Sequence, residues 1–96
     1  MKKFLRGETV TIEDTFKVSG TLTTPDTSST IEIDDPAKTN VVNAQAMSEV
    51  STGFMRYNYT IDAAATTGVY RADTIYVHGG VTTKKRYYFE VALEVD

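Results

Sequence analysis

Apolar and polar residues alternate along most of this chain, with the period of two that is typical of β-strands with one buried face. The alternation is most regular between residues 55 and 62 and between residues 87 and 95. In both runs the odd-numbered positions are apolar or aromatic and the even-numbered positions are mostly polar. The predicted core faces are Met55, Tyr57, Tyr59 and Ile61 in the first run and Tyr87, Phe89, Val91, Leu93 and Val95 in the second.

The first half of the chain carries weaker strand signals. Apolar residues alternate with polar ones over 10–18, and Asp14 breaks this register, which predicts a bulge or the end of a strand at that point. A short strand around Ile31 and Ile33 is bounded on both sides by turn-forming residues. Over 37–49 the pattern fades, and a single helical turn competes with extended chain.

Turn signals separate these runs and indicate the fold class. Gly79 and Gly80 predict a tight hairpin, because both central positions of such a turn favour residues that tolerate a positive φ. About seven short strands, with turns at intervals of roughly 8 to 12 residues, are typical of a sandwich or small barrel rather than of βαβ units. No linker is visible, so residues 1–96 are predicted to form a single all-β domain.

Composition narrows the functions that such a domain can have. The net charge of −3 argues against nucleic acid as the main partner, since phosphate binding needs a basic face. The chain has no cysteine and one histidine, which excludes disulfides, thiolate catalysis and multi-histidine metal sites. The first residues lack the apolar stretch of a signal peptide or membrane helix. We therefore expect no cofactor, no membrane partner and no enzymatic activity, and leave the localisation open.

The segment Thr66–Ala72 resembles the corner that leads into strand F of immunoglobulin-like domains. In that corner a Gly-x-Tyr sequence precedes an inward small residue or cysteine, and the tyrosine hydroxyl bonds back to the corner backbone. The resemblance makes Tyr70 that tyrosine and Ala72 the inward residue. The chain departs from antibody-type domains because it has neither tryptophan nor cysteine, and because Thr66 stands where an acidic residue is usual.

Residues 7–12, with the sequence GETVTI, are similar to the first strand of cysteine-free immunoglobulin-like modules. Such modules occur in bacterial surface proteins, in phage structural proteins and in macroglobulin domains of the MG2 type. The resemblance implies an immunoglobulin-like antiparallel β-sandwich of about seven strands. It also implies a role in adhesion, spacing or assembly, without shared catalytic residues.

Charged residues give few signs of a chemical site. Lys84, Lys85 and Arg86 are followed by tyrosines, as in single-strand nucleic-acid binders, but three cations neutralise few phosphates, so a solvated hairpin is the favoured interpretation.

The acidic loops and the single histidine also give little sign of a metal site or a catalytic site. Asp34 and Asp35, even with Asp26, supply too few ligands for calcium and lack the spacing of an EF-hand loop, so no metal site is predicted. His78 precedes the Gly-Gly turn and has no nucleophile or carboxylate that the sequence places beside it.

Aromatic residues outside the core are the more informative set. If the core takes Tyr57, Tyr59, Tyr70, Tyr87 and Phe89, three other aromatics remain for the exterior, where they would mark a protein interface if they share one sheet. The predicted binding residues are Phe54, Tyr76, Lys84, Lys85, Arg86 and Tyr88.

These patterns predict a non-enzymatic structural or protein-binding module that contacts a protein partner or assembles with itself, in a virion or a surface assembly. A small carbohydrate- or metal-binding module is the alternative, with Asp26, Asp34, Asp35 or exposed tyrosines as ligands. A further hypothesis is that the chain is a stalk domain excised from a larger adhesin.

Overall fold

The fold consists of β-strands joined by turns. A computed structural model describes residues 1–93, and within them there is no helix. The prediction of an all-β protein is therefore confirmed for this part of the chain. The strands are β1 (Lys3–Leu5), β2 (Thr9–Thr15), β3 (Lys17–Val18), β4 (Thr21–Leu22), β5 (Ser28–Asp34), β6 (Asn40–Ala46), β7 (Ser48–Ser51), β8 (Phe54–Thr60), β9 (Gly68–His78) and β10 (Val81–Ala92).

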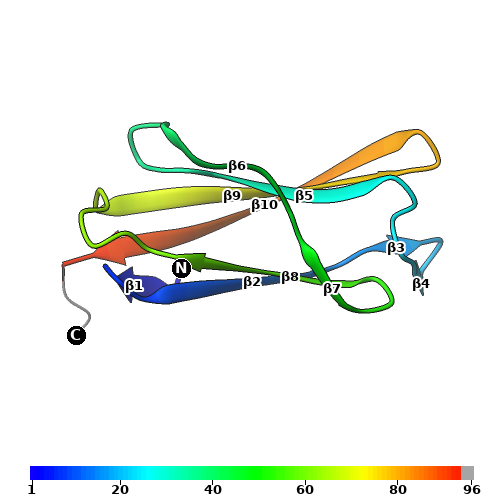
Figure 1. Ribbon diagram of the computed structural model, residues 1–96, viewed down its shortest axis with the longest axis horizontal. Helices are drawn as coiled ribbons and strands as arrows, with labels where there is room; N and C mark the ends of the chain where they lie inside the picture. The colour runs from blue at the N-terminus through cyan, green and yellow to red at the C-terminus, as the bar shows by residue number, and fades with distance from the viewer. Residues whose placement is uncertain (94–96) are drawn as a thin grey trace.

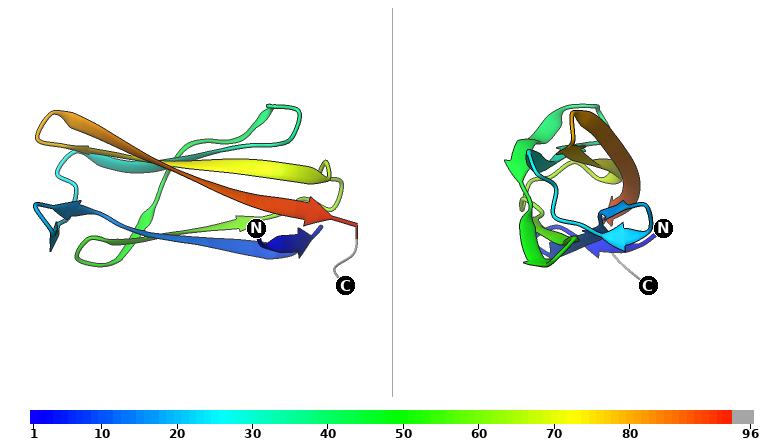
Figure 2. Two further views of the ribbon diagram at one scale, coloured as in Figure 1. Left: turned by 180° about the vertical axis from the view of Figure 1, so that it is seen from behind. Right: turned by 90° about the vertical axis from the view of Figure 1, so that its right-hand side faces the viewer.

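Two sheets lie one over the other (Figure 1). The larger sheet has the strand order β1-β10-β9-β5-β6, and the smaller has the order β2-β8-β7. Neighbouring strands are antiparallel except for β1, which runs parallel to the end of β10. The short β3–β4 hairpin lies at one end of the molecule (Figure 2).

The core lies between the two sheets and contains most of the inward positions that alternation predicts, although Tyr87, predicted to face it, is 36% exposed. The run from 55 to 62 buries Met55 and Ile61, with Tyr57 and Tyr59 partly buried against them. Removal of such side chains from water is the main favourable term in folding. The buried apolar residues are Val10, Ile12, Phe16, Ile31, Ile33, Val42, Met47, Met55, Ile61, Tyr70, Ala72, Tyr76, Phe89 and Val91.

One side of the sandwich is closed by the chain itself. β6 leaves the larger sheet and continues into β7, which belongs to the smaller sheet, so the chain crosses from one layer to the other (Figure 1). Ala44, with a φ of 49°, lies where the pairing of β5 with β6 shifts register. A helical turn and extended chain are the two alternatives predicted over 37–49. The structure has mostly strand there, with an irregular register.

The last hairpin has the predicted turn. Gly79 and Gly80 have φ values of 58° and 76°, and His78 pairs with Val81 across the turn. β10 ends at Ala92 rather than continuing along the predicted run. Leu93, predicted to face the core, is 75% exposed because it lies beyond the strand pairing. Val95, predicted on the same strand face, lies outside the described residues.

The corner before β9 has the hydrogen bond that its resemblance to an immunoglobulin-like corner implies. The Tyr70 hydroxyl donates a hydrogen bond to the carbonyl oxygen of Thr66 at 2.7 Å. Ala72 is completely buried, and the Tyr70 ring stacks on Phe89 of β10 with their centroids 5.2 Å apart. The hydroxyl bond satisfies a polar group at the edge of the core, which allows the ring itself to fill the core.

Gly53 provides a test of the β7–β8 turn. Its φ is 73°, and a Cβ there would lie 2.7 Å from the Phe16 carbonyl oxygen and the Thr23 backbone nitrogen. We expect Gly79→Ala, with positive φ but open space, to lower the free energy of unfolding by about 1–2 kcal/mol. Gly53→Ala should lower the free energy of unfolding further, because the backbone of Phe16 and Thr23 must also move to make room for the Cβ. Urea denaturation of both variants checks this, and equal losses would contradict the clash.

Candidate functional site

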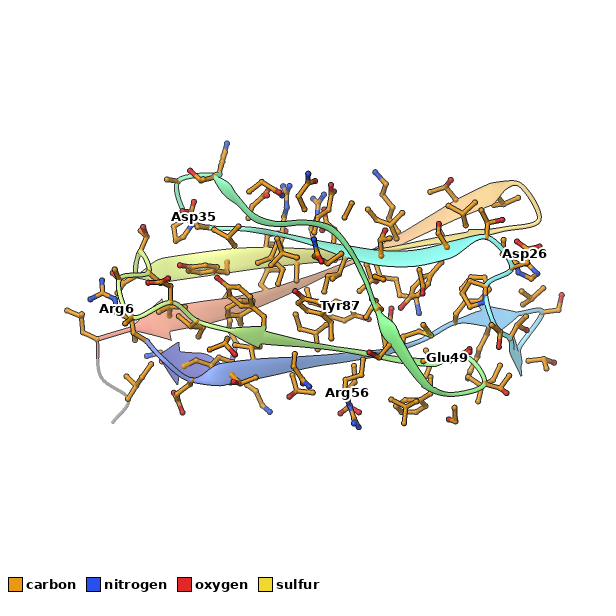
Figure 3. All side chains as sticks on the ribbon, in the orientation of Figure 1. Arg6, Asp26, Asp35, Glu49, Arg56 and Tyr87 are labelled. Carbon is orange, nitrogen blue, oxygen red and sulfur yellow. The ribbon has the colours of Figure 1, made fainter. Side chains whose placement is uncertain are left out.

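A buried carboxylate on β2 is the most unusual polar feature of the fold. Asp14 is 7% exposed and accepts four side-chain hydrogen bonds from the opposite sheet. The Tyr76 hydroxyl and the Thr74 hydroxyl donate to Oδ2 at 2.7 and 3.0 Å, and the Tyr87 hydroxyl donates to Oδ1 at 2.7 Å. The Lys85 ammonium lies 3.1 Å from Oδ1. We call these five residues the Asp14 cluster; Figure 3 shows Tyr87 at mid-length between the sheets.

Strand alternation explains why these side chains meet. Thr74 and Tyr76 occupy inward positions of β9, and Lys85 lies directly opposite Thr74 in the pairing of β10 with β9. β2 continues without a bulge through Asp14, which pairs with Met55, and ends one residue later. The predicted bulge is therefore wrong, and the strand end is displaced by one position, because the carboxylate finds donors rather than disturbing the pairing.

The cluster alters the acidity of its members. Burial alone would raise the pKa of Asp14, but hydrogen bonds from Tyr76, Tyr87, Lys85 and Thr74 outweigh it and hold the pKa below its ordinary value of 3.8. Burial and the bond to Asp14 raise the pKa of the Tyr87 phenol to about 12. The same two causes raise the pKa of Tyr76 above its ordinary value. At neutral pH the cluster thus holds one carboxylate and neutral phenols.

Two predicted binding residues belong to this cluster rather than to the exterior. Tyr76 is completely buried, so the prediction that it lies on an outer face is wrong. β9 is continuous from Gly68 to His78, which gives Tyr76 the same inward parity as Tyr70. The Lys85 ammonium turns inward to Asp14 and to the Thr15 carbonyl oxygen. No signal within either local segment identifies these contacts, since the partners are distant along the chain.

Strand alternation places the other two residues of the basic run, Lys84 and Arg86, on the opposite face of β10 from Lys85. Arg86 faces outward and pairs with Asp73 of β9, with Nε 2.9 Å from Oδ1. Lys84 is exposed on the outer side of β10. The three cations therefore differ in their surroundings. The partly exposed Lys85 reaches inward to Asp14, Arg86 is paired with Asp73, and Lys84 lies at the surface.

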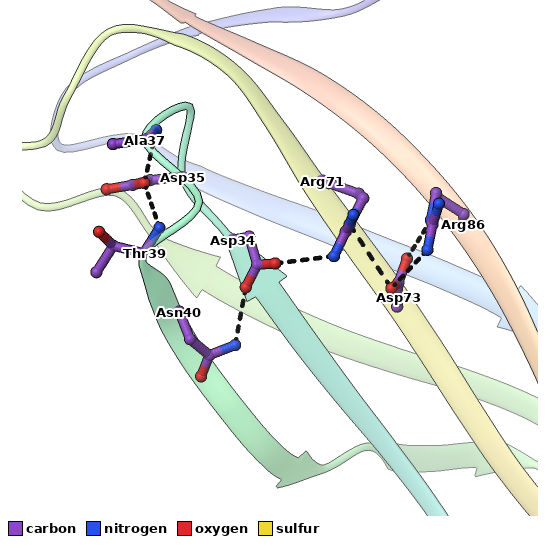
Figure 4. A network of polar contacts seen from close by, with 8 residues as sticks. All are labelled: Asp34, Asp35, Ala37, Thr39, Asn40, Arg71, Asp73 and Arg86. Carbon is purple, nitrogen blue, oxygen red and sulfur yellow. Dashed lines mark hydrogen bonds and ion pairs between the residues drawn. The ribbon is translucent and has the colours of Figure 1, made fainter.

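Arg86 ends a ladder of charges across the outer face of the larger sheet (Figure 4). Asp73 also lies 3.7 Å from Arg71 Nε, and Arg71 Nη2 lies 2.9 Å from Asp34 Oδ2. Asn40 donates to the other Asp34 oxygen at 2.9 Å, which extends the ladder to β6. Because the two arginines and two aspartates balance, the ladder offers no net charge to a ligand.

An exposed apolar patch lies beside this ladder. Tyr88 is 52% exposed and Val69 is 44% exposed, and both line a shallow hollow of about 290 Å³ together with Pro36. Asp34 and Asp35 form part of its rim. We call Tyr88, Val69 and Pro36 the Tyr88 patch. A rigid aromatic surrounded by polar residues is the composition of a small protein-contact surface.

The remaining predicted aromatic lies elsewhere. Phe54 is 37% exposed at the start of β8, in the smaller sheet. Tyr88 is in the larger sheet, so the two exposed aromatics do not share a surface. The predicted binding set is thereby separated into the buried Tyr76, the partly buried Lys85, the neutralised Arg86 and three exposed positions. Of these three, Phe54 lies on β8, whereas Lys84 and Tyr88 both lie on β10.

The carboxylates of the acidic loop residues accept hydrogen bonds from nearby groups of the protein itself. Asp35 Oδ1 accepts hydrogen bonds from the N–H groups of Ala37 and Thr39, both at 2.9 Å, which holds the β5–β6 turn. The N–H of Asp26 donates to His78 Nδ1 at 3.0 Å, and the Asp26 carboxylate accepts from Thr27 and Gly79. Within residues 1–93, no three His, Asp or Glu side chains are grouped to hold a metal ion.

Comparison of the chain with protein-family models, with curated proteins and with solved structures finds no match. Among the described residues there is also no helix of the length and apolarity needed to cross a membrane. Function is therefore inferred from the geometry of this chain alone.

Asp14→Asn tests the cluster. The amide leaves the partly buried Lys85 ammonium without a counter-charge, and we expect the free energy of unfolding to fall by about 3 kcal/mol at neutral pH. Because the folded pKa of Asp14 lies below its unfolded value, its contribution is present above about pH 4 and is lost as pH falls. Urea denaturation from acid to neutral pH should thus show a flatter acid limb for Asp14→Asn than for the wild type.

The matched control for this change is Glu32→Gln, which removes one carboxylate from the outer side of β5. We expect it to leave both the stability at neutral pH and the acid limb close to those of the wild type. If the two variants behave alike, the acid dependence comes from net charge and not from the cluster.

Tyr87→Phe tests the alkaline side. The folded pKa of Tyr87 is about 12, above its unfolded value of about 10, so its contribution is present below pH 10 and is lost as pH rises toward 12. Wild-type stability should fall across this window, and Tyr87→Phe should reduce the fall. Urea denaturation at pH values from 10 to 12 measures this loss of stability. Tyr88→Phe, on the exterior, is the control and should lose stability with pH as the wild type does.

Proposed function

We propose that this chain is a non-enzymatic structural or protein-binding module built as an immunoglobulin-like β-sandwich. The strand order supports the fold assignment: β5, β9 and β10 would correspond to strands C, F and G, and β2, β8 and β7 to strands B, E and D. The hydrogen bond from Tyr70 to Thr66 at the entrance of β9 supports it further, because a tyrosine corner occupies this place in such domains.

One observation carries the functional part of the proposal. The aspartates and the histidine described above are engaged with other side chains or with local backbone, in the Asp14 cluster, the charge ladder and the turns at Asp26 and Asp35. Catalysis requires a nucleophile, base or acid within reach of an accessible substrate position. The Tyr88 patch instead offers exposed apolar contact area, which favours binding to another protein.

The setting we propose is a virion or a surface assembly. Non-catalytic sandwich domains serve there as spacers or attachment points, and their function depends on the surface they present. Nucleic acid is a poor partner for this chain, because the exposed basic run reduces to Lys84 once Lys85 and Arg86 are paired.

Light scattering over a hundredfold range of concentration, about 1 to 100 μM, tests the proposal without a second component. We expect a mass above that of one chain that rises with concentration. Tyr88→Ala should return the protein to a monomer, since it removes the largest member of the Tyr88 patch. Phe54→Ala, an exposed aromatic on the smaller sheet, is the control and should leave the mass unchanged.

A strict monomer would contradict self-assembly and restrict the proposal to a different protein as partner. A small-ligand site is the second candidate, favoured by the hollow of about 290 Å³ where Tyr88 meets Asp34 and Asp35. Stoichiometric binding of calcium or a glycan, abolished by Asp35→Asn, would support that alternative and contradict protein binding at this face.

A further inference from the structure

The open side of the sandwich, between β2 and β10, has an unpaired strand edge. β10 pairs with β9 from Val81 to Val91, but on its other edge β1 covers it only opposite Glu90–Ala92. Along 81–88, no strand among the described residues pairs with this edge. At about 3.3 Å per residue, roughly 25 Å of β10 is therefore free.

The backbone groups on this edge belong to the even-numbered residues. The N–H of Glu90 donates to the Lys2 carbonyl oxygen at 2.9 Å, which shows that Glu90 points its backbone groups toward the β1 side. Successive residues of a strand direct these groups to alternate edges. The N–H and C=O groups of Thr82, Lys84 and Arg86 therefore face the open side, and such a row is a template for an added strand.

Two hollows lie along the same edge. The first, of about 460 Å³, lies between β2 and the later part of β10 and is lined by Val10, Ile12 and Tyr87 among others. The second, of about 370 Å³, lies between β3 and the start of β10 and is lined by Phe16 and Val81 among others. A strand added to β10 would direct alternate side chains into the space between the sheets, so these hollows would accept its apolar residues.

The charged residues beside the free edge of β10 indicate which kind of peptide would bind there. Lys84 lies on β10, Lys2 lines the first hollow and Lys17 lines the second. These lysines form no ion pair within residues 1–93. Glu13, which also lines the first hollow, is neutralised by Arg56 at 2.9 Å. The edge is therefore cationic and is complemented by carboxylates.

A second copy of this chain does not meet these requirements. Antiparallel two-fold pairing of the free part of β10 with itself would place the 84–86 run close to its own copy, and like charges opposite each other destabilise a strand pair. Building on the proposed protein-binding function, we infer that the free edge of β10 binds an extended acidic peptide segment of a partner protein as an added strand.

The test uses a blocked peptide of about nine residues in which valine and aspartate alternate, so that one face is apolar and the other acidic. Binding is followed by NMR and by amide hydrogen exchange on the whole chain. We expect the amide protons of Thr82, Lys84 and Arg86 to exchange at least about tenfold more slowly with the peptide bound, because they become hydrogen-bonded donors. Added salt should weaken the binding.

Two variants and two control peptides make the result specific. Lys84→Pro removes an N–H that faces the open side and no bond to β9, so it should weaken binding at least about tenfold while the fold is retained. Lys84→Glu tests the charge without altering the backbone and should also weaken binding. A peptide N-methylated at alternate residues, or one with lysine in place of aspartate, should bind at least about tenfold more weakly than the probe.

Equal binding of either control peptide, protection confined to other strands, or no binding at about millimolar peptide would overturn the inference. The outcome is separable from that of the proposed function. Association through the Tyr88 patch is measured by mass and is removed by Tyr88→Ala, so it can persist when the edge binds nothing. Peptide binding at the edge can likewise occur in a chain that remains monomeric.

Discussion

The burial of the Asp14 carboxylate is the constraint on which the arrangement of the two sheets depends. A charge between sheets is strongly unfavourable unless it is hydrogen-bonded and paired. Asp14 meets this requirement with donors from β9 and β10, whereas its own strand belongs to the smaller sheet. Since no strand of one sheet pairs with a strand of the other among the described residues, the cluster adds a directional link to apolar packing that is itself non-directional.

The position of the cluster is related to how the sandwich is closed. On one side the chain crosses from β6 to β7, but on the other side β1 is short and leaves most of β10 uncovered. Lys85 and Tyr87 reach Asp14 from this uncovered strand, and their side chains stay partly exposed. A purely apolar seam there would expose hydrophobic surface along an open edge, which favours aggregation. The polar cluster joins the sheets at that side without such exposure.

Local sequence signals predicted the parts of this structure that are determined locally. Periodicity predicted the strand around Tyr57, and the paired glycines predicted the Gly79–Gly80 turn. The resemblance to an immunoglobulin-like corner implied the bond from Tyr70 back to the corner backbone. The Asp14 cluster could not be predicted in that way, because its members are 60 to 73 residues from Asp14 and each looks ordinary in its own segment. Tyr76 differs from the rest of the cluster, because its inward position follows from a local signal: along a continuous β9 it has the same parity as Tyr70.

The register of β10 against β9 connects the cluster to the outer surface. A shift of β10 by one residue relative to β9 would exchange its two faces. Lys84 and Arg86 would then face the interior in place of Lys85, and the Asp14 carboxylate would lose two of its donors. The cost of leaving that charge unpaired disfavours the shift. The contact between Asp14 and Lys85, together with the burial of Phe89 and Val91, thereby favours the register in which Tyr88 lies on the outer face and the backbone of Lys84 and Arg86 faces the open side. Interactions inside the sandwich thus help to specify the two surfaces that we propose for binding.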